Sequence, residues 1–297
     1  MPAREYWVNF YQVRNAGKAN LTFDQAVQQI WGLNKGRRLH SLSDGETYGL
    51  YSVDIDGPFV CGEMGRLSID QIDPKGDRDG NVEPMPIEDD EGQVHLNYFA
   101  YHIPTRCVAV PFQQSGVRAN RIQQFLNGHY GPASMFLLEQ LFDAEVYREL
   151  LSRMKKQRKA VLKIRMPKNG SLLRDAGLDD SEIISIARTY QAATVKVELS
   201  LDRRPGSLKA VERLIRPFLK MPDALQAARI EGRGANDEKL DPVDFLGLAL
   251  RTRATFRISR KTRRTVPRQA YAVLKGAIQE KLHEITSVAD NNCAAAD

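Results

Sequence analysis

One segment near the C-terminal end of the chain reads RTRATFRISRKTRRTVPR, from Arg251 to Arg268, and it holds eight cations and no acid. In its first half, Ala254, Phe256 and Ile258 alternate with arginine and threonine. Because successive side chains of a β-strand point to opposite faces, this period predicts a strand with one apolar face and one cationic face. Such a strand packs its apolar face on a core and leaves its guanidinium groups in solvent, an arrangement that suits a polyanionic ligand.

The distribution of charge along the chain supports the same interpretation. The 297 residues are 42% hydrophobic and 27% charged, a globular composition with enough length for two domains. Residues 1–152 carry a net charge of −7, and residues 153–297 carry +13. This asymmetry favours an anionic partner, nucleic acid above all, for the second half. The alternative is that these cations pair with the acidic first half, within one chain or across a dimer.

Targeting signals and cysteine usage indicate a cytoplasmic protein without a cofactor. No window approaches the roughly 18 uninterrupted apolar residues of a membrane helix, and the N-terminus lacks the pattern of a secretory signal. The three cysteines, Cys61, Cys107 and Cys293, are scattered and lack the spacing of metal ligands. We therefore expect reduced thiols, with Cys61 and Cys107 packed in strands.

The first half predicts an acidic α/β domain, residues 1–155, that makes partner or dimer contacts. Its expected elements are strands over 7–14, 48–55, 59–64, 94–103 and 106–112, and helices over 23–32 and 117–127. Asp56 and Gly57 predict a hairpin, and the Asp-, Gly- and Pro-rich segment 73–92 predicts a loop. After the turn at 128–132 we expect another helix or helical pair that runs to about residue 156.

The second half predicts a basic α/β domain, residues 156–297. Its expected strands cover 159–166, 194–201, 227–233 and 253–260, and its expected helices cover 180–190, 207–219, 242–250 and 268–286. We expect the four strands to form one sheet with helices on one face and a basic open face. The last helix is expected to pack back on the first domain. The whole chain is thus predicted to be α+β (mixed α/β), with two domains.

The cations of this open face, and those of the turns that follow its second and last strands, are the candidate DNA-binding residues. Arginine favours phosphate because its planar fork donates two parallel hydrogen bonds and is weakly hydrated. The candidates are Lys163, Arg165, Lys196, Arg203, Arg204, Arg229, Arg233, Arg251, Arg253, Arg257, Arg260, Lys261, Arg263 and Arg264. The second half has few aromatic residues, which favours binding to a duplex backbone over stacking of single-stranded bases.

Enzymatic motifs are missing from the sequence: it contains no GxxxxGK[ST], GxSxG or HExxH. We therefore assign no catalytic residue and no metal ligand. The enzymatic alternative is a metal-dependent nuclease that uses the carboxylates of Asp223 and Glu231, with Arg233 where such enzymes have a lysine. A further alternative is a protein-interaction regulator that does not bind DNA.

Several segments occur in the order of a known family. They are NFYQVR, YGLYSVDIDGPFV, HIPTRCVAVPFQQSGVRANRIQQFLNG, KAVLKIRMP and TVKVELSL. In this order the chain resembles the RexA family of phage exclusion proteins. The resemblance implies a homodimeric, sequence-nonspecific double-stranded DNA-binding protein of antiviral defence, which activates a RexB-type membrane effector in abortive infection. It matches Arg229 and Arg233 to the DNA-contacting strand and turn of the family, and the Arg-rich region 251–264 departs from the family pattern.

Overall fold

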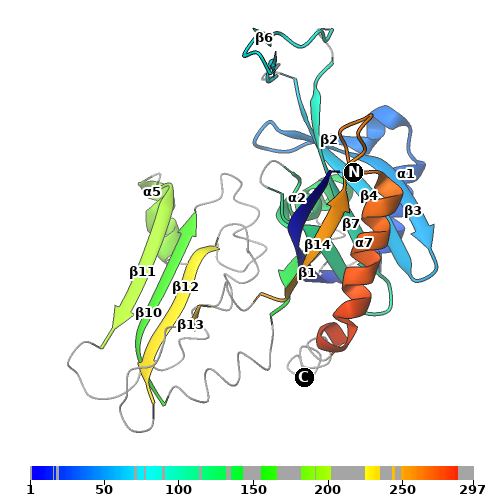
Figure 1. The fold of residues 1–297 in the computed structure, drawn as a ribbon. Coiled ribbons are helices and arrows are strands. Elements are labelled where there is room, and N and C mark those ends of the chain that lie inside the picture. Colours follow the sequence, from blue (N-terminus) through cyan, green and yellow to red (C-terminus); the bar gives the residue numbers. More distant parts are fainter. Residues whose placement is uncertain are drawn as a thin grey trace.

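The computed structural model contains two large antiparallel sheets and packed helices (Figure 1). It describes residues 2–286 apart from 16, 18–19, 70–71, 77, 89–90, 114–115, 132–134, 143–154, 166–181, 191, 202–224, 235–242 and 245–248. The α+β class predicted from the sequence is confirmed. Within the described ranges, no helix is long and apolar enough to cross a lipid bilayer.

The first sheet has eight strands. They are β1 (Ala3–Asn15), β2 (Leu39–Ser41), β3 (Thr47–Asp56), β4 (Phe59–Ser68), β7 (Gln93–His102), β8 (Cys107–Pro111), β9 (Phe136–Gln140) and β14 (Arg251–Arg257). Their order is β14-β1-β8-β7-β4-β3-β2, and β9 pairs with β1. One edge of β1 is therefore divided: residues 3–9 pair with β14, and residues 11–15 pair with β9.

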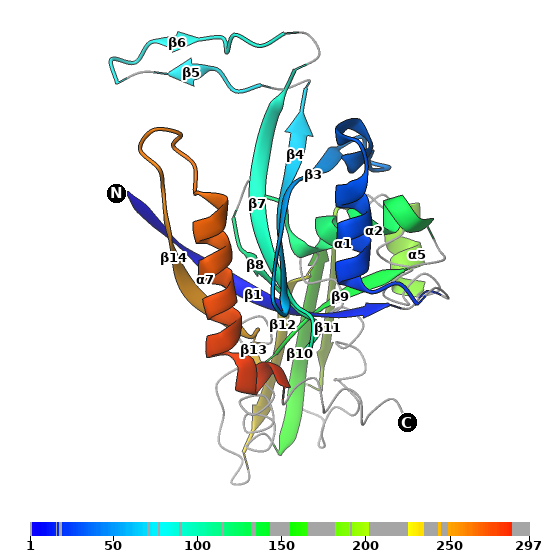
Figure 2. The same cartoon turned by 90° about the vertical axis from the view of Figure 1, so that its right-hand side faces the viewer.

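Helices cover both faces of this sheet (Figure 2). On one face lie α1 (Phe23–Gly32), α2 (Ala119–Tyr130) and the short 3-10 helix η1 (Lys35–Arg38), which contact β2, β3 and β9. On the other face lies α7 (Pro267–Glu280), whose buried Tyr271 and Leu274 pack with Phe10 of β1. Since Val8 and Phe10 join the core under α7 while Tyr11 and Val13 join the core under α1 and α2, the period of two is visible along β1.

Several expectations for the first half are confirmed. Gly57 lies in the tight turn between β3 and β4, with a left-handed φ of 56° that glycine adopts without strain. Cys61 and Cys107 are buried, unpaired thiols in β4 and β8. The segment 73–92 adds a small hairpin, β5 (Lys75–Gly76) and β6 (Val82–Glu83), which projects from the sheet as an arm (Figure 2). We call residues 75–83 the arm.

The prediction of a helix after residue 132 is wrong for the described residues of that segment. Residues 136–140 form β9, in which Phe136, Leu138 and Gln140 are buried at a period of two. A short apolar run is compatible with a strand or a helix. Here it forms a strand because it pairs with residues 11–15 of β1, the part of that edge which β14 leaves open. In the helix predicted over 242–250, residues 243–244 form β13 (Val243–Asp244) instead. The helix predicted over 207–219 lies outside the described residues.

The second sheet has four strands in the order β11-β10-β12-β13. They are β10 (Lys156–Arg165), β11 (Thr194–Ser200), β12 (Leu225–Arg233) and β13, and α5 (Glu182–Thr189) lies next to them (Figure 1). Leu162, Ile164 and Ile230 are buried on one face of the sheet, as are Ile184 and Ala187 of α5. The predicted strands over 159–166, 194–201 and 227–233 thus do share a sheet.

The prediction that 253–260 is the fourth strand of that sheet is wrong. This segment forms β14, which pairs along its whole length with β1 of the first sheet. Its apolar residue Phe256 is 1% exposed and packs in the core that contains Val8 and Tyr271. The alternating pattern correctly predicts a strand and its two faces. The pattern carries no information on which sheet edge the strand joins. The predicted basic open face therefore lacks the cations of β14, which belong to the first sheet.

Candidate nucleic-acid interface

Strand β14 lies at the edge of the first sheet and exposes a row of arginines. Arg251, Arg253 and Arg257 are exposed and point away from the face on which Phe256 is buried. Residues two apart on one face of a strand are about 6.6 Å apart, so the guanidinium groups are spread along the strand rather than clustered at one point. We call these three residues the arginine row.

Trp7 of β1 lies directly beside this row. In the β1–β14 register it is the partner of Arg253. The guanidinium carbons of Arg251 and Arg253 lie 4.3 and 4.8 Å from the centroid of the indole ring. Each contact contributes about 0.5–1 kcal/mol at an exposed site, and the exposed Arg253–Glu5 ion pair at 3.1 Å contributes at most about 1 kcal/mol. The row is thus oriented by weak contacts that a phosphate can replace.

A second aromatic ring continues this surface on the far side of β1. The amide of Phe112 donates a hydrogen bond of 2.7 Å to the carbonyl of Trp7. Phe112 is 46% exposed, and the guanidinium carbon of Arg118 lies 5.1 Å from its ring centroid. Side chains two residues apart on a strand lie on the same face of the sheet, so Phe112 lies on the face of Val110 and Trp7 on the face of Tyr11. Val110 and Tyr11 belong to one core cluster, so the two rings lie on the same face. Two aromatic rings, each with arginine against it, therefore lie on neighbouring chain segments.

Beyond β14 the chain folds into a tight turn over residues 258–265, which we call the cationic turn. Ile258 and Thr265 form a β-bridge, and the amide of Arg263 donates a 2.8 Å hydrogen bond to the carbonyl of Ser259. Arg263 has a φ of 53°, a left-handed conformation that is uncommon for residues other than glycine. Arg260, Lys261 and Arg263 are exposed on the turn.

Arg264 has a different role from its neighbours. One of its guanidinium nitrogens lies 2.8 Å from the carboxylate of Glu63, a β4 side chain that is 7% exposed. The Tyr98 hydroxyl donates a 2.8 Å hydrogen bond to the carbonyl of Thr265, and burial raises the pKa of Tyr98 to about 12, so the donor keeps its proton. These two contacts anchor the base of the cationic turn to the centre of the first sheet.

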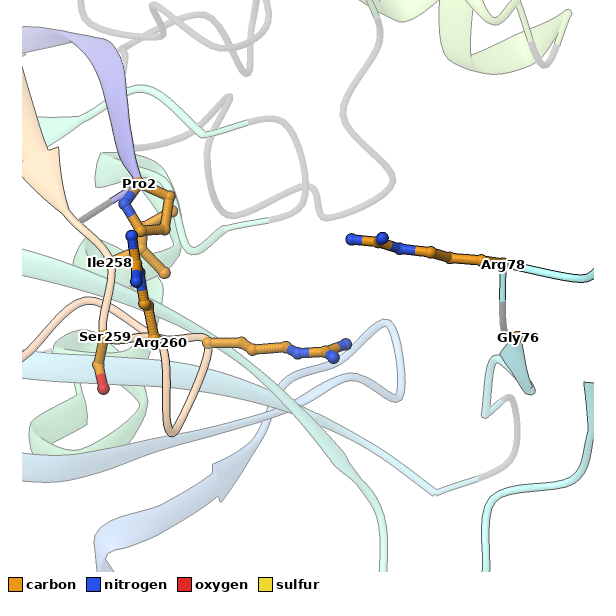
Figure 3. Close-up of a pocket in the computed structure, with 7 residues that line it drawn as sticks. Pro2, Gly76, Arg78, Ile258, Ser259 and Arg260 are labelled. Carbon is orange, nitrogen blue, oxygen red and sulfur yellow. The ribbon is translucent and has the colours of Figure 1, made fainter.

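The cationic turn and the arm enclose an open pocket with a volume of about 670 Å3 (Figure 3). It is lined by Pro2, Gly76, Arg78, Ile258, Ser259, Arg260 and Arg263. Arg78 extends from the arm toward the turn (Figure 3). No carboxylate lines the pocket, and the described part of the chain shows no ion pair at Arg78, Arg260 or Arg263. We call it the arginine pocket.

On the second sheet, unlike in the arginine pocket, acidic residues lie beside several of the cations. Lys163 and Lys196 are direct cross-strand partners, and the carboxylate of Glu198 lies 2.7 Å from the ammonium groups of both Lys196 and Lys159. Hydrogen bonds from these two lysines lower the pKa of Glu198 to about 2. Arg229 is exposed and has Asp244 as its cross-strand partner.

The candidate residues thus divide between two surfaces. Arg251, Arg253, Arg257, Arg260, Lys261 and Arg263 lie along β14 and the cationic turn, whereas Lys163, Lys196, Arg229 and Arg233 are exposed on the second sheet. Arg165 ends β10, without a described side chain, and Arg203 and Arg204 lie outside the described residues.

Of the two carboxylates in the nuclease hypothesis, only that of Glu231 lies in the part of the chain that the structure describes. Glu231 lies in β12, with Lys159 as its cross-strand partner, and Asp223 lies outside the described residues. A search of the described ranges finds no group of three or more His, Cys, Asp or Glu side chains able to hold a metal ion.

Sequence reasoning missed the residues of this surface that come from the first half, among them Trp7, Phe112, Arg118 and Arg78. The charge pattern directed attention to the basic second half, and only tertiary pairing brings these residues next to β14 and the cationic turn. No protein-family model matches the chain. The comparison with curated proteins finds no match either.

Proposed function

We propose that this protein binds double-stranded DNA without sequence preference, and that the arginine row and the cationic turn contact the phosphate backbone. The observation that carries the proposal is the exposure of six cations along one edge strand and the turn that continues it. A strand of seven residues spans about 20 Å, which corresponds to roughly six base pairs of duplex at 3.4 Å each.

The chemistry of these six cations favours the phosphates of DNA as the ligand over the carboxylates of an acidic protein. Five of the six cations are arginines, whose forks engage phosphate oxygens in a bidentate manner. The three arginines of the arginine row lie on the edge strand of a sheet and not in a concave cleft, which fits a long rod-shaped ligand. Their contacts with Trp7 and Glu5 are weak enough to be exchanged for phosphate contacts on docking. Backbone contacts carry no sequence information, so nonspecific binding follows.

The test is a titration of labelled duplex DNA at salt concentrations from about 50 to 200 mM. Each neutralised phosphate adds about −0.9 to the slope of log K against log salt, so six cations predict a slope of about −5. The double variant Arg253→Gln, Arg257→Gln is expected to make this slope shallower by about 2.

The matched control is Arg229→Gln, Arg233→Gln, which removes the same charge from the second sheet. We expect it to reduce affinity less than the β14 variant. A larger loss in this control would move the interface to the second sheet, and wild-type affinity that does not respond to salt would refute backbone binding.

The resemblance to the RexA family adds two partners to the proposal, a second copy of the chain and a RexB-type membrane effector. Sedimentation of the purified protein tests the first partner. A species of twice the 33.5 kDa chain mass is expected, and a single 33.5 kDa species at micromolar concentration would contradict it.

A further inference from the structure

The arginine pocket differs from the arginine row in that it is concave and built from two separate segments. Arg78 comes from the arm, while Arg260 and Arg263 come from the cationic turn. Like charges held around one space repel each other, and here no carboxylate among the lining residues offsets the repulsion. An anion between the three guanidinium groups would remove this repulsion and satisfy donors on several sides.

We propose that the arginine pocket binds a phosphate monoester, the terminal phosphate of a nucleic-acid strand or of a free nucleotide. A terminal phosphate carries about −1.5 to −2 charges and three strong acceptor oxygens, whereas an internal phosphodiester of DNA carries one charge. A pocket lined by three arginines suits the terminal group better, because a guanidinium group can donate two hydrogen bonds to its oxygens.

The size and the remaining lining of the pocket fit the rest of a nucleotide. A volume of about 670 Å3 lies within the usual range of small-ligand sites, about 300–1,000 Å3, and exceeds what a bare phosphate needs. Pro2 and Ile258 supply apolar surface beside the arginines. The Ser259 hydroxyl accepts a 3.3 Å hydrogen bond from the amide of Thr262, which leaves its own proton for the ligand.

The side of the pocket that the cationic turn forms is preorganised. The amide of Ile258 donates a 2.8 Å hydrogen bond to the carbonyl of Pro2, and the Arg264–Glu63 ion pair holds the far end of the turn. The left-handed φ of Arg263 costs of order 1 kcal/mol. A strained conformation held by its surroundings at a ligand site is a recurrent feature of binding sites, because it reduces the ordering needed on binding.

The position of the pocket connects it to the proposed function. The row ends at Arg257, and the pocket begins at Ile258, so a strand whose backbone follows the row would place its end in the pocket. For a strand end, this inference therefore rests on DNA binding by β14. For a free nucleotide it stands on the pocket alone.

The experiment compares two blunt duplexes of identical sequence, one with 5′-phosphates and one with 5′-hydroxyls, and adds AMP as the free nucleotide. We expect about tenfold tighter binding of the phosphorylated duplex, the effect of roughly one charge-assisted hydrogen bond. Arg78→Ala and Arg263→Ala should each abolish this preference. Arg268→Ala, which removes an exposed arginine outside the pocket, should keep it.

The outcomes separate the two proposals. Equal, salt-dependent affinity for both duplexes, together with no saturable binding of AMP, would refute the pocket proposal and leave backbone binding intact. Saturable AMP binding that Arg78→Ala abolishes, without affinity for either duplex, would support the pocket and refute the proposed function. If AMP displaces the phosphorylated duplex down to the affinity of the hydroxyl form, the pocket accepts free nucleotides as well as strand ends; if it does not, the strand end is the ligand.

Discussion

The guanidinium group of Arg264 lies 2.8 Å from the carboxylate of Glu63, so an exposed turn is tied to a buried position in the middle of a sheet. Glu63 lies in β4, which is separated by three strands from β14, the edge strand that leads into the turn. The pair explains why a segment as polar as 259–264 has a defined path, and why Arg264 differs from the other arginines of the turn.

Arg264→Ala is therefore expected to destabilise the fold, unlike substitutions of its neighbours. The change leaves the Glu63 carboxylate buried without its cationic partner, at a cost of about 1–3 kcal/mol. Arg260→Ala removes an exposed side chain and should change the free energy of unfolding by less than about 0.5 kcal/mol. Urea unfolding of both variants measures the difference, and Arg264→Ala, Glu63→Gln should recover part of the loss. Equal stability of the two single variants would show that the ion pair does not anchor the turn.

Trp7 is expected to report DNA binding by its fluorescence. Its ring contacts two arginines of the row, so phosphates that engage these arginines change the surroundings of the indole. The chain has one other tryptophan, Trp31, which contacts Arg38 of η1. Saturating DNA should change the emission of the wild type and of Trp31→Phe, and should leave that of Trp7→Phe constant. A response that survives in Trp7→Phe and disappears in Trp31→Phe would place the DNA near α1 instead.

Stability is expected to fall with acidification in a window set by His129. Burial, with a smaller contribution from neighbouring His40, lowers the pKa of His129 to about 4. The unfolded state, with a pKa near 6.5, then binds more protons than the folded state between these values. This contribution to stability is complete above about pH 6.5 and decreases as the pH falls toward 4.

His129→Phe should make the pH dependence of unfolding shallower in that window, because an apolar ring replaces the titrating one against Phe125. Urea unfolding at pH 7 and pH 5 measures it, with His283→Phe at an exposed position as the control. An unchanged difference between the two pH values in His129→Phe would assign the acid sensitivity to other groups.

Arg263→Gly should separate stability from ligand binding. Glycine adopts a φ of 53° freely, and this gain is partly offset by the larger entropy of its unfolded state, so unfolding should change by less than about 1 kcal/mol. Preference for a 5′-phosphorylated end should nevertheless disappear. Arg106→Gly is the matched control, since Arg106 has a φ of 51° outside the pocket. Loss of the preference in both variants would point to an indirect effect.

The sequence predicts much of the local structure, and particular residues show why. The alternation around Phe256 correctly gives a strand with a buried and a cationic face, and Gly57 correctly marks a hairpin. Both features are set by neighbouring residues, through side-chain direction in one case and allowed φ in the other.

The missed features depend on residues far apart in the sequence. β14 and β9 both join β1, whose own pattern does not say which strand occupies its edge. The arginine pocket needs Arg78 of the arm next to Arg260 of the cationic turn, and no periodicity relates these two residues. The candidate site was therefore predicted as the cationic face of one four-stranded sheet, whereas the structure divides those cations between β14 with its turn and the second sheet.

The pairing of β14 with β1 also bears on how the protein is made. Residues 3–9 leave the ribosome long before their partners at 251–257, with most of the first sheet synthesised in between. Closing so long a loop is entropically slow, so the β1 edge is left without β14 while the intervening residues are being synthesised. Trp7 can meet Arg253 only once β14 has itself been synthesised. A nascent chain that lacks β14 thus has no arginine row.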